Sequence, residues 1–190
     1  DVATKEYRAI MGEVDFSNPK PVAMLKDLIE YATNPTEETI ILDFFSGSGT
    51  IAHAVMQLNA EDNGNRHFVC VQLPELTDEN TEAYKAGYRN LCEIGKERIR
   101  RAGQKIKDEA GMLANNLDTG FKVFKLDTSN LKLWDGIPVG VGNGQLYFDK
   151  VRNVIDGIKE DREAIEVVYE LMLKLGVPLT CEVAEKEVMG

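Results

Sequence analysis

The residues best suited to chemistry lie in one short stretch, ILDFFSGSGTIAHAV, which spans residues 41–55. An apolar run ends at Asp43, a turn with Gly47 and Gly49 follows, and an apolar helical pattern comes next. Rossmann-like sheets bind nucleotide-like cofactors with this order of strand, glycine turn and helix. Because glycine has no Cβ, the backbone can approach a ligand, and the helix start presents unpaired N–H groups to it. The stretch predicts a cofactor-binding turn, with a purely structural turn as the alternative.

The charge of Asp43 narrows the class of ligand. A carboxylate at the tip of a strand would repel a pyrophosphate, whereas it suits a ligand with a positive charge or with hydroxyl and amine donors. S-adenosylmethionine (SAM) carries a sulfonium, an α-amino group and ribose hydroxyls. The turn also lacks the GxGxxG spacing of a dinucleotide-dependent oxidoreductase. We therefore favour a SAM-dependent methyltransferase over a dehydrogenase.

The bulk composition is that of an ordinary globular protein. The chain has 190 residues, of which 43% are hydrophobic and 28% are charged. No apolar run approaches membrane-spanning length and the N-terminus is polar, so we expect a cytoplasmic protein with no membrane partner. The three cysteines match no zinc spacing and no disulfide framework, which predicts inert thiols and no metal site.

The charge pattern argues against this segment binding nucleic acid by itself, because the formal net charge is −10. Basic residues nevertheless crowd one predicted helix. We interpret them as a solvated helix face, with a phosphate-facing edge of a larger complex as the alternative. These residues are Lys96, Arg98, Arg100, Arg101, Lys105 and Lys107.

Hydrophobic spacing predicts the elements that position the turn. Two buried strands, 39–45 and 67–73, flank a helix and therefore form a parallel pair. Beyond this pair, we expect a short helical or turn-rich lead-in at 1–15, helices at 22–32, 79–112, 146–158 and 163–175, and strands at 120–127 and 179–183. The fold class is α/β, a mainly parallel sheet flanked by helices. We assign residues 1–136 to the cofactor-binding portion and 137–190 to a helical C-terminal extension.

Several motifs in order resemble a known family. FSNPKP, ILDFFSGSGTIAHAVMQLN, VQLPE, IGKERIRRAG and GFKVFKLDTSN look like the C-terminal part of the modification subunit of type III restriction–modification systems. Those subunits are SAM-dependent DNA adenine-N6 methyltransferases of the β-group. The resemblance covers about residues 5–135. It implies a partial Rossmann-like methyltransferase fold, SAM as cofactor, DNA and a restriction subunit as partners, and a homo-oligomer.

The resemblance also implies what the chain does not carry. The family's catalytic tetrapeptide is an Asp or Asn followed by two prolines and an aromatic residue, and no such pattern occurs in this sequence. In the motif order of the β-group it precedes the NPKP and glycine motifs, so we expect it before Asp1. The chain is then the cofactor half of the enzyme, inactive alone, with no catalytic residue and no base-reading region of its own.

Site residues follow from the resemblance. Asp43 is expected to face the methionine amino group or the sulfonium, and Lys20 either neutralises the methionine carboxylate or is an exposed lysine in a rigid turn. The ribose hydroxyls fall to Gln72 or Glu75, which the sequence does not separate. Asp127, with its neighbours Ser129 and Asn130, either approaches the adenine edge or caps a turn. The full predicted cofactor-binding set is Phe16, Asn18, Lys20, Pro21, Asp43, Phe45, Ser46, Gly47, Ser48, Gly49, Thr50, Gln72 and Glu75.

Two other functions remain as alternatives. The same fold serves RNA and small-molecule methyltransferases, since a fold does not determine the acceptor. The chain is alternatively a non-catalytic scaffold that docks another subunit through its C-terminal helices. That function predicts an exposed apolar patch, made by Val167, Val168, Leu171, Met172 and Leu175.

Overall fold

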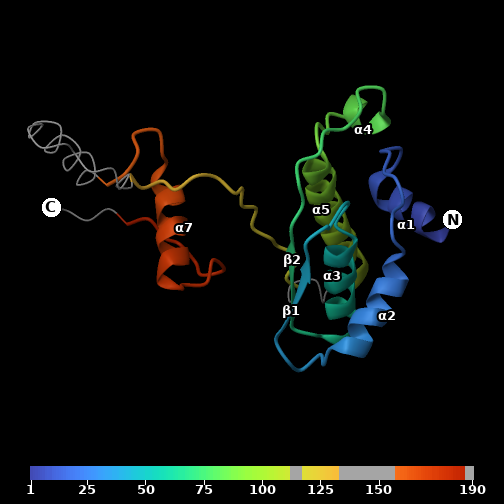
Figure 1. Ribbon diagram of the computed structural model, residues 1–190. Helices are drawn as coiled ribbons and strands as arrows, with labels where there is room; N and C mark the ends of the chain where they lie inside the picture. Colours follow the sequence, from blue (N-terminus) through green and yellow to red (C-terminus); the bar gives the residue numbers. More distant parts are fainter. Residues whose placement is uncertain (112–116, 133–156, 187–190) are drawn as a thin grey trace, which may run out of the picture. The chain divides into compact units, whose positions relative to one another are not determined.

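The computed structural model describes residues 1–111, 117–132 and 157–186, which divide into two compact units. Unit 1 is Asp1–Phe121 and unit 2 begins at Lys122, and each is described by itself. Unit 1 contains α1 (Val2–Met11), α2 (Val22–Ala32), β1 (Thr39–Asp43), α3 (Thr50–Asp62), β2 (Arg66–Cys70), α4 (Glu82–Lys85) and α5 (Leu91–Ala110) (Figure 1). Unit 2 contains α7 (Ala164–Leu175). The boundary expected after residue 136 and most of the helix expected at 146–158 lie outside the described residues.

A two-stranded parallel sheet organises unit 1, as the alternation of strand, helix and strand predicts. The register pairs Leu42 with Val69 and Asp43 with Cys70, so both strands finish at the same edge of the sheet. The turn after β1 and the loop after β2 therefore start side by side. An α/β fold with a small parallel sheet and flanking helices is confirmed.

Helix α3 is the centre of unit 1, because neighbours cover most of its circumference. Val55 and Leu58 pack with α2 and with the sheet residues Ile41 and Phe68. Met56 packs with Ile99 and other apolar residues of α5 in a second cluster. A third cluster joins α1 to α5. The helices α2, α3 and α5 thus lie on one side of the sheet (Figure 1).

The end of the sheet remote from the glycine turn is held by a buried arginine. Arg66 pairs with Asp62 at 2.9 Å, and its Nε donates to Thr33 Oγ1 at 2.7 Å. Its carbonyl accepts from Asn59 Nδ2 at 2.7 Å. One residue therefore connects the ends of α2 and α3 to the start of β2.

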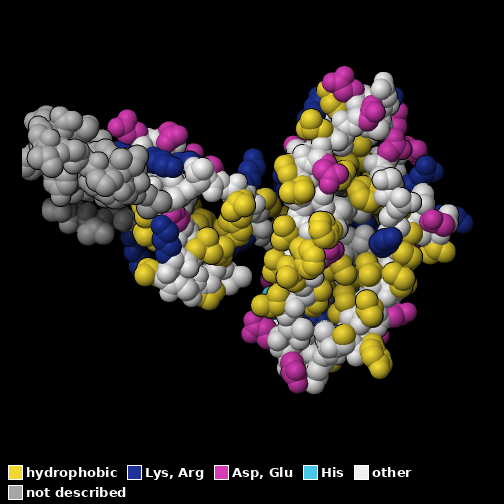
Figure 2. Space-filling model, in the orientation of Figure 1, with side chains coloured by type: hydrophobic (Ala, Val, Ile, Leu, Met, Phe, Trp, Pro, Cys, Tyr) yellow, Lys and Arg dark blue, Asp and Glu magenta, His cyan; other side chains and the backbone are white. Residues whose placement is uncertain are grey.

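The other face of the sheet is open, which corrects one prediction. The sequence predicts fully buried strands, but exposed and half-buried residues alternate along β1 and β2 because the described helices cover only one face. Ile40, Leu42 and Val69 are 65%, 58% and 46% exposed, and Val71 and Leu73 extend the apolar strip beyond β2. Figure 2 shows hydrophobic side chains gathered where β1 and β2 lie.

The chain after β2 departs from the prediction in two places. The long helical region expected at 79–112 is broken into α4 and α5 at Gly87, where φ is 98°. Residues 120–127 and 179–183 form no strand, so both predicted strands are wrong, since neither segment hydrogen-bonds to a neighbouring strand.

Unit 2 is built around α7, whose predicted range is confirmed within one residue. Glu163 and Glu166 form a capping box at its start, and Gly176 ends it in the left-handed conformation. The apolar patch expected on this helix is only partly present. Val168, Leu171 and Leu175 are exposed, whereas Val167 and Met172 are buried. Across the described part of the chain, no helix has both the length and the apolar character needed to cross a bilayer.

The open sheet face predicts self-association of the isolated chain, because contiguous exposed apolar surface favours it. We expect the double substitution Leu42→Lys and Val69→Lys to reduce oligomer formation and to reduce the binding of hydrophobic dyes to the protein. Both side chains are exposed, so the free energy of unfolding should change by less than about 1 kcal/mol. Light scattering and sedimentation check the association, and urea unfolding checks the stability.

A matched control places lysines at Val2 and Leu28, which are 64% and 61% exposed on α1 and α2. That variant should associate as the unmodified chain does. Equal association of both double variants would contradict the assignment of the sheet face as the adhesive surface.

Candidate functional site

The turn between β1 and α3 is held by backbone bonds to the loop after β2. Val71 donates its N–H to the Asp43 carbonyl at 2.8 Å, and Ser46 donates to the Val71 carbonyl at 3.2 Å. Within the turn, Gly49 donates to the Ser46 carbonyl at 2.7 Å. The side chain of Asp43 is half-buried and its Oδ1 accepts from Phe45 N at 3.3 Å. The acid therefore sits at the start of the turn, as the sequence predicts.

Gln72 extends this connection with its side chain. Its Oε1 accepts the N–H of Gly47 at 2.8 Å, and its Nε2 donates to the Leu73 carbonyl at 3.2 Å. Glu75 is exposed, and within the described residues its carboxylate forms no hydrogen bond or ion pair. The two candidates for the ribose contact thus differ, because the Gln72 amide already holds the turn while the Glu75 carboxylate is available.

Helix α5 packs directly beneath the turn, at a place where side chains are missing. A Cβ on Gly95 would lie 3.1 Å from the carbonyl oxygen of Gly47. A Cβ on Gly49 would lie 3.1 Å from Cγ1 of Ile99, and Gly49 has a φ of 75° that side chains disfavour. The turn and the helix therefore approach backbone to backbone, which requires glycine on both sides.

The FSNPKP segment reaches the turn through its aromatic residue. A Cβ on Gly47 would lie 3.1 Å from Cζ of Phe16, whose ring centroid is 5.7 Å from that of Tyr7. Asn18 and Lys20 are exposed, and the backbone of Asn18 is left-handed with a φ of 53°. Pro21 caps α2. The structure thus brings Phe16 to the turn and leaves the polar side chains of the segment in solvent.

The remaining members of the predicted set divide into inward and outward residues. Phe45 is 80% exposed, and Ser46 and Gly47 are half-buried. Ser48 and Thr50 are buried, with 2% and 6% of their surface exposed, and their hydroxyls face the protein interior. Their hydroxyl groups therefore hold the turn from its buried side.

The interior partner of these hydroxyls is Arg98, which the sequence predicts to lie on a solvated helix face. Its Nη1 donates to Ser48 Oγ and to Thr50 Oγ1, at 2.6 Å each. Arg98 is 0% exposed, so the prediction of a solvated face is wrong for this residue. Its spacing from Gly95 and Ala102 on the buried stripe of α5 was the available signal. Arg100, Arg101 and Lys105 are exposed, Lys96 and Lys107 are half-buried, and Arg101 pairs with Glu97 at 2.7 Å.

Two further buried polar groups lie behind the turn. Burial lowers the pKa of His53 from 6.5 to about 4, with help from the positive charges of Arg98, Lys105 and Lys26. Burial also raises the pKa of Tyr7 to about 12, against the opposing charge of Arg98. Within residues 1–111, 117–132 and 157–186, His53 Nδ1 and the Tyr7 hydroxyl have no hydrogen-bond partner. Both groups are therefore neutral at physiological pH.

The described surface of unit 1 includes a larger and a smaller depression. The larger, of about 560 Å³, lies in the loop that follows Glu75 and is lined by residues from Leu76 to Arg89. The smaller, of about 230 Å³, lies beside His53 between α1, α3 and α5. Neither includes the residues of the glycine turn. The N–H groups of the turn from Phe45 to Gly47, and that of Gly49, are already donated within unit 1. The first N–H groups of α3, together with the acid Asp43 at the start of the turn, form an arrangement that can hold a small zwitterionic ligand.

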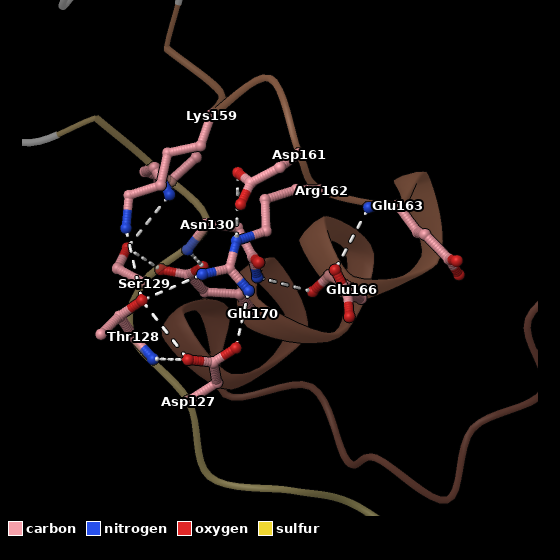
Figure 3. Close-up of polar contacts among 11 residues, drawn as sticks. Asp127, Thr128, Ser129, Asn130, Lys159, Asp161, Arg162, Glu163, Glu166 and Glu170 are labelled. Carbon is pink, nitrogen blue, oxygen red and sulfur yellow. Dashed lines mark hydrogen bonds and ion pairs between the residues drawn. The ribbon is translucent and has the colours of Figure 1, made fainter.

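The polar residues of segment 127–130 belong to unit 2. Asp127 pairs with Arg162 at 2.7 Å, and Asn130 N donates to Glu170 Oε2 at 2.6 Å (Figure 3). Ser129 Oγ donates to the same carboxylate. The ammonium of Lys174, together with these donors, lowers the pKa of Glu170 to about 2. In this structure Ser129 and Asn130 connect the segment to α7, and Asp127 connects it to Arg162 just before that helix.

Comparisons with known proteins place this site in a family. Residues 4–120 match the DNA methylase family. The chain is 42% identical to the Mod subunit of the type III restriction–modification enzyme StyLTI of Salmonella typhimurium, over 70% of this chain and 20% of that protein. It is 40% identical to the EcoPI Mod subunit of Escherichia phage P1, over 64% and 18%. It is 39% identical to the EcoP15I Mod subunit of Escherichia coli, over 66% and 18%. The chain thus spans about a fifth of the length of these relatives.

The backbone approach beneath the turn predicts that Gly49→Ala is strongly destabilising. A left-handed alanine costs about 1 kcal/mol, and contact with Ile99 raises the expected total to about 2–3 kcal/mol. The control is Gly176→Ala, because Gly176 has a similar φ of 72° with open space around its Cα. Urea unfolding followed by circular dichroism compares the two. Equal losses would mean that backbone conformation, and not the packing of α5, accounts for the effect.

Buried His53 predicts a loss of stability on acidification. Its folded-state pKa of about 4 lies below the ordinary 6.5, so the unfolded chain binds the proton first. Stability should therefore be full above pH 6.5 and fall as the pH drops toward 4, by about 1.4 kcal/mol per pH unit. His53→Gln should flatten this profile in urea unfolding at pH 7, 5.5 and 4.5. His67→Gln, at an exposed histidine, should leave it unchanged.

Proposed function

Because the chain belongs to the DNA methylase family, we propose that it is the cofactor-binding part of a site-specific DNA adenine-N6 methyltransferase of the type III restriction–modification kind. The observation that carries the proposal is the glycine turn that Phe16, Gln72 and α5 enclose within the matched residues. The three Mod-subunit relatives support the type III assignment. DNA and a restriction subunit are then partners of the intact protein, which we expect to form a homo-oligomer in the cytoplasm.

We propose SAM as the ligand of the turn. The N–H groups at the start of α3 suit its methionine carboxylate, and the exposed Lys20 can add a charge-assisted bond. The carboxylate of Asp43 suits the α-amino group or the sulfonium. Glu75 takes the ribose hydroxyls, since the Gln72 amide is already bonded to Gly47. Each assignment matches a charged or polar group of the ligand with an available partner.

The part played by this chain is positioning. When bound, SAM supplies an electrophilic methyl group for an adenine amino nitrogen. The turn, Asp43 and Glu75 orient the ligand, while Phe16 and the exposed Phe45 give apolar surface beside it. DNA-modifying enzymes of this kind extrude the target base from the helix. The groups that hold the adenine belong, in this proposal, to another part of the intact protein.

The open face of the sheet supports a larger, Rossmann-like domain. Parallel sheets are nearly always covered on both faces, whereas the face with Leu42 and Val69 is exposed here. We propose that further strands and helices of the intact methyltransferase complete the sheet. This accounts for an apolar surface that a two-stranded sheet does not bury by itself.

Calorimetric titration with SAM tests the proposal, with NAD as the control ligand. We expect saturable SAM binding, no NAD binding, and at least tenfold weaker SAM binding after Asp43→Ala. Glu75→Gln should also weaken SAM binding, because it removes the carboxylate that we assign to the ribose hydroxyls. Asp27→Ala, at an exposed acid on α2, should leave both ligands unaffected. Failure of both the 190-residue chain and a full-length protein containing it to bind SAM would overturn the proposed function.

A further inference from the structure

Arg98 combines full burial with incomplete hydrogen bonding. One nitrogen, Nη1, supplies both bonds to the turn hydroxyls, while Nε and Nη2 are buried without a partner among the described residues. The guanidinium also lies 5.4 Å from the ring centroid of Tyr7. A buried cation with two orphan nitrogens, which carry three N–H groups, is costly, so its retention beneath the turn calls for an explanation.

The positive charge of Arg98 has no anionic partner in the part of the chain that the structure describes. The carboxylate of Glu6 influences it from a distance, but Glu6 Oε2 accepts the backbone N–H of Val22 at 2.7 Å. Burial accordingly lowers the pKa of Arg98 to about 10, which still leaves the guanidinium charged at physiological pH. An uncompensated buried charge is most stable when an anion comes near it.

The turn is the place where such an anion can approach. Ser48 and Thr50 hold their hydroxyl oxygens toward Arg98, so the guanidinium lies directly behind the backbone that faces outward. Gly49 has no Cβ on the side that faces α5, where one would lie 3.1 Å from Ile99, so the turn backbone lies close to the helix that carries Arg98. Field from the charge therefore passes through a thin layer of turn atoms, in an interior of low effective dielectric.

We propose that Arg98 is a positioning residue of the turn and that its buried charge selects ligands that carry a carboxylate there. The inference rests on the proposed function and deepens it, because it names which group of the ligand the turn recognises and what supplies the attraction. The two hydroxyl bonds hold the turn in its binding geometry. The guanidinium charge then favours the carboxylate without touching the ligand.

The test compares two ligands that differ only in the carboxylate, S-adenosylhomocysteine and its decarboxylated form. Dissociation constants are measured with the full-length protein that contains these residues. Arg98→Met should weaken binding of S-adenosylhomocysteine roughly tenfold and change binding of the decarboxylated ligand less than about twofold. Arg98→Lys, which retains the charge, should restore most of the preference for the carboxylate. Arg100→Met is the matched control on an exposed position of α5 and should change neither constant.

The outcomes test the role of Arg98 separately from the proposed function. Equal weakening of both ligands by Arg98→Met, without rescue by Arg98→Lys, would make Arg98 a structural residue and overturn the inference. Unchanged binding of both would overturn it as well. Failure of the unsubstituted protein to bind S-adenosylhomocysteine would instead overturn the proposed function. Thermal unfolding of every variant identifies any that does not fold. If Arg98→Met does not fold, Arg98→Gln, which removes the charge and keeps an amide donor, replaces it with the same expected loss of carboxylate preference.

Discussion

Unit 1 depends on the approach of two backbones, that of α5 at Gly95 and that of the turn after β1. Neither partner has a Cβ at the contact, and a side chain on either would meet the other at about 3.1 Å. This packing brings the buried stripe of α5 against α3, where Met56 and Ile99 share an apolar cluster. It also places Arg98, one turn along α5, within hydrogen-bond distance of Ser48 and Thr50. Packed interiors transmit such constraints because they leave little free volume.

The polar interactions of the site are arranged in two layers around that contact. Outside, Asp43 and Gln72 join the ends of the two strands to the turn. Inside, Arg98 joins the turn to α5, next to the neutral groups of His53 and Tyr7. The inner layer is incompletely paired, a state that proteins tolerate chiefly where function requires it. The turn is thus held by side chains from three elements rather than by its own sequence alone.

The two faces of the sheet differ in how well they are covered. One face packs on α2, α3 and α5, and the other exposes Ile40, Leu42 and Val69 to solvent. A two-stranded parallel sheet gains little from its own hydrogen bonds, so the helices on the packed face stabilise unit 1. Unit 2 is held differently. There Ser129 and Asn130 bond to Glu170 of α7, and Asp127 pairs with Arg162 just before the helix.

The sequence by itself determined the local elements and the identity of the turn. Spacing of apolar residues located α2, the two strands and α7, and placed α5 within a longer predicted helix, because these features depend on neighbours along the chain. The glycines located the turn after β1. Only the tertiary structure decided that Arg98 is buried, that Gln72 is bonded to Gly47 and that 120–127 is not a strand. A strand needs a partner, and burial of a charge needs acceptors such as Ser48 and Thr50, fifty residues or nearly so away in sequence. Such partners are supplied by the fold, and no local pattern encodes them.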